Sequence, residues 1–398
     1  MTTSTLALLG GKAVRHPDKN WPAWPQYDQR EENALLEVLH RDSWLFGPKV
    51  QEFEAAYAAF QGADHCISCN SGTAAAEIIL QAMGIGAGDE VLVPPYTFIA
   101  TASAVLRVGA TPIFVDLDDS WCMDPDLAEK AITPRTRAIM PVHFGGRICD
   151  MDKMNELGSR HGIPVIEDAC HSWGGRWKSQ GTGTIGACGF FSFQASKNIT
   201  AGEGGGIVTN DEELATKVRS LTNCGRGKPG SPWYYHLNVG TNARLSEFQA
   251  AILVCQLERA EEHILRRAEN ASILNQGLAE IEGLHLQRKS NRITRRAWHL
   301  YCLRLDESAF GCTRERFVEA AVAEGLPITA GYPMPIYKQP VFQNLTCYDY
   351  STVSCPFTED LCAKSGMWLP HQILLGTEED MHDIVSIIRK IKENASSL

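Results

Sequence analysis

The chain has 398 residues, of which 44% are hydrophobic, and its formal net charge is −10. This length suffices for two domains, and the ordinary hydrophobic content predicts a large buried core. The acidic balance and the lack of a basic block argue against nucleic acids and anionic membranes as partners.

Two further features of the composition suggest a soluble, cytoplasmic protein. No run of 18 apolar residues occurs, and the first twelve residues lack the basic start of a signal peptide. The thirteen cysteines are odd in number and scattered, mostly through apolar runs. We therefore expect free thiols instead of a disulfide framework.

The first 30 residues are predicted to form an extended arm. Within it, Trp21-Pro22-Ala23-Trp24-Pro25 is more typical of a segment that packs on the body than of a ligand site. Helical periodicity follows over residues 28–41 and 50–61.

Strand-like and helix-like stretches then alternate. Strands are expected at residues 65–69, 90–93, 111–115, 138–142, 164–166, 189–193 and 206–208, and helices at 73–84, 98–108, 125–132 and 150–162. This alternation predicts an α/β fold whose mostly parallel, seven-stranded sheet is covered on both faces. The last two strands have no helix between them, so one antiparallel step is expected.

The pattern changes after residue 222. Residues 223–242 are rich in Gly, Pro and aromatic residues and predict a long loop of functional importance, or one that covers a partner. A long helical segment is expected from Ser246 to about Ile281. Beyond it, a strand at 298–305 and helices at 314–324 and 378–393 predict a smaller α+β domain.

One lysine stands out among apolar and small residues. Lys197 lies five residues after Ser192, which ends the strand-like Phe190–Ser192 run, and Gly202–Gly206 follows. Desolvation favours a neutral amine, which Schiff-base chemistry requires. The alternative for Lys197 by itself is an exposed lysine on a glycine-rich loop.

An acidic residue follows a predicted buried strand. Asp168 lies at the end of residues 164–168, where parallel strands place ligands. There it is suited to pair with a cation such as the protonated nitrogen of a pyridine-type cofactor. The alternative is that Asp168 caps the next element. Glu167 should point to the opposite face of the strand.

A strand-to-helix turn offers a phosphate site. Ser71, Gly72 and Thr73 begin a predicted helix, where free backbone N–H groups bind anions, and Ser192 could add a hydroxyl. The alternative is an ordinary helix N-cap, and both can hold together. Tyr96 or Phe98 could stack on a flat ring, although core packing is the alternative.

Two motif matches carry no function here, and the histidines form no metal motif. Gly181–Gly186 fits G-x-G-x-x-G but precedes a strand and opens no helix. Cys66 and Cys69 fit C-x-x-C, but a spacing of three within a strand sends the thiols to opposite faces. The histidines show no ligand spacing, so no metal site is predicted.

Taken together, these residues resemble the DegT/DnrJ/EryC1/StrS family of pyridoxal 5′-phosphate (PLP)-dependent sugar and cyclitol aminotransferases. The most specific match is Lys197–Gly205. Matches at Pro141–His143, Val165–Ala169 and Asn242–Glu247 support it, and the resemblance covers nearly the whole chain from Trp21. It implies fold type I, like aspartate aminotransferase, with an arm (1–30), a large PLP-binding domain (31–255) and a small C-terminal domain (256–398).

The resemblance also implies residue roles. Lys197 would hold the cofactor as an internal aldimine and then move a proton, and Asp168 would pair with the pyridinium nitrogen. Contacts to the cofactor would come from Ser71, Gly72, Thr73 and Ser192 at the phosphate and from Phe98 and His171 at the ring. Asn242 would reach the phosphate of the neighbouring site across a homodimer. Arg244 is a candidate for a substrate carboxylate or a loop brace, and Tyr332 is a further substrate candidate.

Three hypotheses for function follow. The preferred one is an aminotransferase that moves an amino group from glutamate or glutamine to a keto-sugar or keto-cyclitol, in sugar, cyclitol or antibiotic biosynthesis. The second is a lyase that aromatises an aminated ring, as in 3-amino-5-hydroxybenzoate synthases. That subset resembles this chain in His171, the arm at Trp24–Asp28, the Phe191–Gln194 run and His371–Leu375, and scyllo-inosose aminotransferases look similar in the same places. The third is a non-catalytic, cofactor-binding regulator. Because Lys197 is intact, the dehydratase branch is disfavoured.

Overall fold

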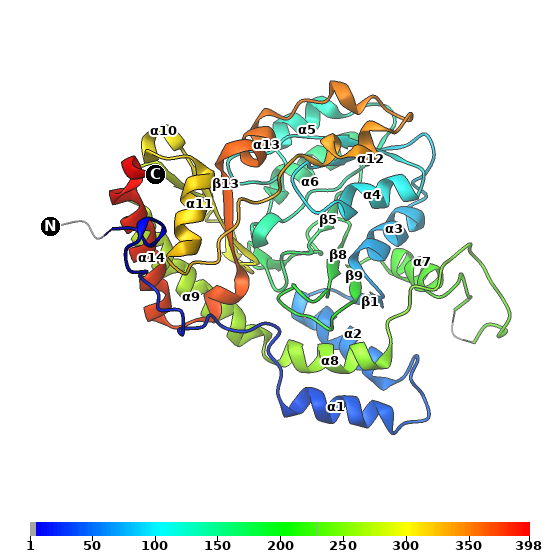
Figure 1. Cartoon of the computed structure of the whole chain (residues 1–398). Coiled ribbons are helices and arrows are strands. Elements are labelled where there is room, and N and C mark those ends of the chain that lie inside the picture. Colours follow the sequence, from blue (N-terminus) through cyan, green and yellow to red (C-terminus); the bar gives the residue numbers. More distant parts are fainter. Residues whose placement is uncertain (1–4, 229) are drawn as a thin grey trace.

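The computed structural model describes residues 5–228 and 230–398. It is an α/β structure in which helices surround β-sheets (Figure 1). The longer helices are α1 (Gln29–Leu39), α2 (Pro48–Gln61), α3 (Gly72–Ala82), α4 (Ala100–Arg107), α5 (Pro125–Ala131), α6 (Met151–His161), α7 (Glu212–Thr222), α8 (Glu247–Glu258), α9 (Ala260–Leu278), α11 (Arg314–Ala323) and α14 (Glu378–Glu393). Short helices are α10 (Glu307–Phe310), α12 (Pro340–Gln343) and α13 (Pro356–Asp360).

The predicted strands are present with small shifts of their bounds. They are β1 (His65–Cys69), β2 (Glu90–Val93), β3 (Thr111–Phe114), β4 (Thr136–Ile139), β5 (Ile166–Asp168), β8 (Cys188–Ser192) and β9 (Gly205–Thr209). β9 pairs antiparallel with β1 and with β8, whereas β5–β8, β2–β3 and β2–β4 are parallel. The expected antiparallel step between the last two strands is therefore confirmed.

The predicted single sheet is divided in the structure. Its seven strands form a four-stranded sheet, β1-β9-β8-β5, and a three-stranded sheet, β3-β2-β4. Only isolated parallel bridges, Ile139 to Val165 and Val142 to Asp168, join the two. Pro141 and Pro164 lie on this boundary. Their carbonyls accept hydrogen bonds, but proline has no N–H to donate, so a continuous ladder cannot form.

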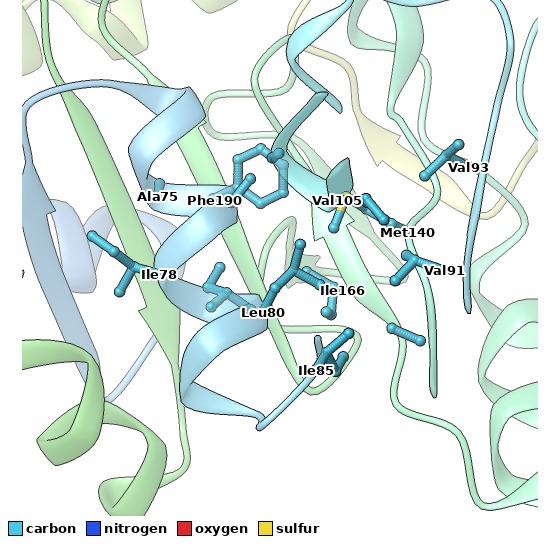
Figure 2. Close-up of a cluster of buried hydrophobic side chains, with 14 of the residues drawn as sticks. Ala75, Ile78, Leu80, Ile85, Val91, Val93, Val105, Met140, Ile166 and Phe190 are labelled. Atoms are coloured by element: carbon cyan, nitrogen blue, oxygen red, sulfur yellow. The ribbon is translucent and has the colours of Figure 1, made fainter. Parts of the chain in front are cut away.

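A hydrophobic core joins α3 to both sheets. Figure 2 shows Leu80 of α3 beside Ile166 of β5, with Phe190 of β8 and Val91 of β2 in the same cluster, and all four side chains are buried. The two cysteines of the C-x-x-C match lie in different clusters, Cys69 in this one and Cys66 in a second, as their opposite faces require. All thirteen cysteines are free thiols.

The C-terminal elements form a separate core, which is distinct from both clusters that hold Cys66 and Cys69. The sheet β10-β12-β13 (Leu284–Leu286, Leu300–Leu305 and Gly366–Pro370) packs with α9, α11 and α14. The N-terminal segment lies against it in Figure 1, and the Arg15 guanidinium donates to Asp380 of α14 at 2.7 Å. Residues 336–355, however, contribute to the core around α3, and the domain limits stay a prediction.

Other details depart from the sequence-based expectation. The helix expected from Ser246 to Ile281 is two helices, because Arg259 leaves the helical path (φ −93°, ψ −2°) between α8 and α9. Helix α7, capped by Asp211, was not predicted, nor was the small sheet β11-β6-β7 (Ile293–Arg295, Arg176–Trp177 and Gln180–Gly181). Within the described ranges, no helix is long and apolar enough to cross a membrane.

Candidate active site

Lys197 lies in the connection between β8 and β9. Backbone hydrogen bonds from Phe193 to Gly204 (2.8 Å) and from Ala195 to Gly202 (2.9 Å) close this connection into a loop. The Lys197 ammonium nitrogen lies 5.9 Å from the ring centroid of Trp173. Burial lowers the pKa of Lys197, and the charges of Cys170 and Asp168 oppose that shift only in part. Its amine is therefore closer to the neutral, nucleophilic form than that of an exposed lysine.

Asp168 ends β5 with a buried carboxylate. Its Oδ2 accepts a hydrogen bond from the Thr101 hydroxyl (2.7 Å), and its Oδ1 accepts one from the Cys170 N–H (3.2 Å). No ion pair to Asp168 occurs among residues 5–228 and 230–398. A buried carboxylate with no cation is costly, so this site is suited to a positively charged ligand group.

Glu167 points to the other face of β5, as predicted. Its carboxylate accepts backbone N–H bonds from Gly183, Ile185 and Gly186 at 2.7–2.8 Å and lies 2.8 Å from Nε2 of His143. The G-x-G-x-x-G match thus forms a turn around an internal carboxylate. It opens no helix, as expected.

The turn before α3 meets the end of β8. Ser71 is the N-cap of α3, and its hydroxyl accepts the Ala74 N–H at 3.1 Å. A Cβ at Gly72 would lie 2.9 Å from Cβ of Ser192 and 3.2 Å from Sγ of Cys170. The N-cap interpretation is therefore confirmed, and Gly72 and Ser192 are close neighbours. Phosphate binding by Ser71, Gly72, Thr73 and Ser192 stays a prediction.

Comparison with known proteins identifies the chain. Residues 25–389 match the DegT/DnrJ/EryC1/StrS aminotransferase family. The chain belongs to this family. It is 37% identical to the L-glutamine:2-deoxy-scyllo-inosose aminotransferase of Micromonospora echinospora, with 99% of both chains covered. It is also 37% identical to the 3-amino-5-hydroxybenzoate synthase of Amycolatopsis mediterranei, over 92% of this chain and 96% of that one.

Solved structures agree with this assignment. A crystal structure of a 3-amino-5-hydroxybenzoic acid synthase matches with a TM-score of 0.86 and 36% identity, over 95% of this chain and 98% of that one. The protein is thus an aminotransferase, and its family implies PLP as the cofactor.

Three histidines of the aminotransferase lie in a row beside Lys197. The ring centroids of His171 and His299 are 4.3 Å apart, and those of His299 and His371 are 5.5 Å apart. Burial lowers the pKa of all three, so they are neutral near pH 7. The row places His171 close to Lys197, but the contact of His171 with the cofactor ring stays a prediction.

Hydrogen bonds fix the protonation of His371 at the end of this row. Its Nε2 faces the carbonyl of Ser196 (3.0 Å), which only accepts, and its Nδ1 faces the guanidinium of Arg267 (3.0 Å), which only donates. His371 therefore carries its proton on Nε2. Trp24 packs edge-on against His371 (4.6 Å) and donates to the Ala195 carbonyl, so the arm packs on the lysine loop.

Two aromatic candidates have different surroundings. Phe98 is 60% exposed and lies three residues before Thr101, so its ring can still meet a ligand, and stacking stays a prediction. Tyr332 packs with Tyr96, Phe144 and Trp368, and burial raises the pKa of its hydroxyl. Phe144 in turn contacts His171 edge-on, which links Tyr332 to the site.

Asn242 and Arg244 lie elsewhere on the aminotransferase. The Arg244 guanidinium donates to Oδ1 of Asn223 (3.0 Å), which favours the loop-brace alternative over a substrate role. Asn242 is exposed and pairs with Asn223 in an isolated bridge. In the part of the chain that the structure describes, neither side chain forms a hydrogen bond or ion pair with Lys197 or Asp168.

The sequence analysis missed Thr101, Trp173 and His299. Thr101 binds Asp168, Trp173 lies under Lys197, and His299 contacts His171. They come from α4, from the turn after β5 and from the start of β12. A short polar or aromatic residue with no local motif gives no signal in one sequence, because only the folded chain brings it to the site.

Proposed function

We propose that this aminotransferase transfers an amino group from glutamine to the ketone of a keto-cyclitol of the scyllo-inosose type, with PLP attached to Lys197. Glutamate is the alternative donor and a keto-sugar the alternative acceptor. The observation that carries the proposal is a buried lysine with a lowered pKa, near enough to the buried Asp168 carboxylate to feel its charge, while that carboxylate has no ion-pair partner among the described residues. The relatives named for glutamine and 2-deoxy-scyllo-inosose support the choice of substrates.

The residues present fit PLP. The N-terminus of α3 offers N–H groups for a phosphate, and the missing side chain at Gly72 leaves the anion a close approach beside Ser192. Asp168 supplies the negative charge that a protonated ring nitrogen requires, and its bond from Thr101 keeps the carboxylate oriented. When bound, PLP supplies an electron sink that makes the bonds at the substrate's α-carbon easier to break.

Lys197 and the neighbouring histidines have separate roles in the proposed reaction. The amine of Lys197 anchors the cofactor and, once released, carries a proton between substrate and cofactor atoms. Its pKa, lowered by burial, increases the fraction of the amine that is free to accept a proton. The neutral row from His171 to His371 places no positive charge beside the lysine, which keeps that pKa from being raised or lowered further by a titrating neighbour.

A homodimer is part of the proposal. Large apolar side chains near α1 and in the 223–242 loop are exposed, among them Trp44, Trp233, Tyr234 and Val239. The loop extends away from the body after α7 (Figure 1). Such a surface is suited to a second copy, to whose site Asn242 would then contribute. We propose the cytoplasm as the location.

An aromatising lyase of the 3-amino-5-hydroxybenzoate synthase type is the second candidate. The specific observation in its favour is the 37% identity to such a synthase, equal to that for the inosose aminotransferase. The two candidates require the same anchoring lysine and differ in the product.

The test is a half-reaction. The enzyme is first converted with glutamine to its amine-loaded form and freed of donor. It is then mixed with 2-deoxy-scyllo-inosose, scyllo-inosose or a nucleotide-linked keto-sugar, while the cofactor absorbance is followed. We expect a keto-cyclitol to restore the original spectrum and to yield an amino-cyclitol. No response to any ketone, together with an aromatic product from an aminated cyclohexenone, would replace the proposal by the lyase.

A further inference from the structure

A basic cavity lies next to the candidate active site but shares no residue with it. It has a volume of about 230 Å³ and is lined by Arg147, by residues 286–290, by Ile293 and Arg296, and by Trp298 and residues near the start of β12. Its lining, taken over the described residues, holds four cationic side chains and no Asp or Glu. Such a lining, with four cations and no carboxylate among the described residues, is unusual in a chain whose net charge is −10.

Arg147 is the deepest of these cations. The residue is only 5% exposed, it forms no ion pair with any described residue, and its Nε has no hydrogen-bond partner. An isolated guanidinium in such a position costs stability, because burial removes water without supplying an acceptor.

Arg296 lines the same cavity and is also without a carboxylate. Its Nη2 donates to Gln287, its guanidinium carbon lies 3.8 Å from the ring centroid of Trp298, and its Nε is unpartnered. Burial lowers its pKa to about 10, and the charge of Arg147 acts in the same direction. The two guanidinium groups therefore repel each other across the cavity in the absence of an anion.

The other two cations differ from this pair. Arg288 is exposed and already bound to Asp118 and Asp119, and Lys289 is exposed at the rim. The unbalanced charge thus belongs to Arg147 and Arg296. Beside them, the stacked rings of Trp298 and Tyr301 (5.7 Å, 19°) give the cavity a flat wall.

We propose that this cavity binds a small phosphate monoester, with the phosphate between Arg147 and Arg296 and the body of the molecule against Trp298 and Tyr301. Guanidinium groups match phosphate oxygens in paired hydrogen bonds. A phosphate dianion balances two cations, whereas a single carboxylate balances one. The volume is several times the ~30 Å³ of one water molecule, so it accommodates more than an ordered solvent site.

Gly146 contacts both the cavity and the candidate active site. A Cβ at Gly146, which precedes Arg147, would lie 2.7 Å from the Trp298 nitrogen and 3.0 Å from the His171 carbonyl oxygen. Cofactor phosphate, in contrast, is proposed at the α3 N-terminus. Binding in the cavity can therefore be measured with the cofactor in place, and its failure would leave the proposed aminotransferase function untouched.

The experiment is calorimetric titration of the full-length holoenzyme in a phosphate-free chloride buffer. Glucose 6-phosphate is the probe, and inorganic phosphate and citrate are the comparison ligands. We expect one saturable site for glucose 6-phosphate and weaker binding of the other two. Arg147→Met and Arg296→Met should each weaken binding at least tenfold. Arg292→Met is the control, since Arg292 lies outside the cavity and pairs with Asp150 and Asp152.

Thermal unfolding provides a second readout. Without ligand, Arg147→Met should raise Tm, because it removes an uncompensated buried charge, and it should abolish the Tm increase caused by glucose 6-phosphate. If this variant does not fold, Arg147→Lys and Arg296→Met take its place. Absence of saturable binding, tighter binding of citrate, or wild-type affinity in both arginine variants would overturn the proposal.

Discussion

Glu167 and Asp168 are adjacent on β5, yet their carboxylates have opposite surroundings. Glu167 is enclosed by three backbone N–H groups and His143, so its charge is satisfied within the fold. Within residues 5–228 and 230–398, the Asp168 side chain has two hydrogen-bond donors, Thr101 and the Cys170 N–H, and no ion-pair partner. Both are buried, so burial does not distinguish them.

We propose that this difference distinguishes a structural carboxylate, Glu167, from one that binds a ligand, Asp168. A buried charge that the protein itself satisfies stabilises one arrangement of the chain, here the 183–186 turn. A buried charge that the protein leaves incomplete is completed by a ligand. Both residues carry a carboxylate and both are buried, so the number of hydrogen-bond donors around each carboxylate is what distinguishes them.

The largest expected effect is on Asp168. Asp168→Asn removes the charge that would hold a protonated ring nitrogen, so we expect turnover to fall about 10²–10⁴-fold. The unfolding free energy of the cofactor-free protein should not fall, since an unbalanced charge is lost. Steady-state kinetics and denaturant unfolding measure the two quantities. Unchanged turnover would remove the distinction between the two carboxylates.

The matched change at Glu167 should affect stability instead. Glu167→Gln replaces a fully bonded carboxylate by an amide whose NH₂ faces backbone donors, so the unfolding free energy should fall by about 2–4 kcal/mol. The kcat of the folded enzyme should stay within about threefold of wild type, by the same reasoning that makes Glu167 structural. Loss of kcat without loss of stability would contradict this expectation.

Acidification should destabilise the protein through the histidine row. Burial lowers the pKa of His171, His299 and His371 in the folded state, whereas an unfolded histidine titrates near pH 6.5. Below about pH 6.5 the unfolded state therefore binds more protons than the folded state. The unfolding free energy consequently decreases as the pH is lowered. His299→Phe should reduce this slope by up to ~1.4 kcal/mol per pH unit.

Unfolding curves between pH 8 and pH 5 measure that slope. His382→Gln, at an exposed position of α14, is the control and should leave the slope unchanged. Equal slopes for wild type and His299→Phe would show that the row does not remain neutral in the folded state.

The smallest effect is expected at Ser71, the N-cap of α3. Ser71→Ala removes the hydroxyl that accepts the Ala74 N–H, so stability should fall by about 1 kcal/mol. If Ser71 also contacts the cofactor phosphate, the affinity for PLP falls as well, whereas a cap alone leaves that affinity intact. Unfolding and cofactor titration of the same variant separate the two.

The fold could largely be predicted from periodicity and chain order. The alternating runs from His65 to Thr209 predicted the strands and the antiparallel pairing of the last two. The division of the sheet at Pro141 and Pro164 could also have been anticipated, since both prolines are visible in the sequence. The break at Arg259 could not, because its partner Glu31 lies far away in the chain.

The candidate site was predictable where its residues carry local motifs. Lys197, Asp168 and Gly72 stand at strand ends or helix starts, which a single sequence reveals. Thr101 and His299 reach the site only through folding, and no spacing links them to Asp168 or His171. The unpaired charge of Arg147 is equally invisible, since it depends on the absence of an acidic neighbour in space.

Covalent trapping tests directly whether Lys197 is the residue that binds PLP. The purified enzyme is reduced with borohydride, which makes the link between PLP and an amine irreversible, and its peptides are analysed by mass spectrometry. The mass of reduced PLP should appear on the peptide that contains Lys197, and it should be absent from Lys197→Ala treated in the same way. The same mass on a different lysine, or on none, would contradict the assignment of this site.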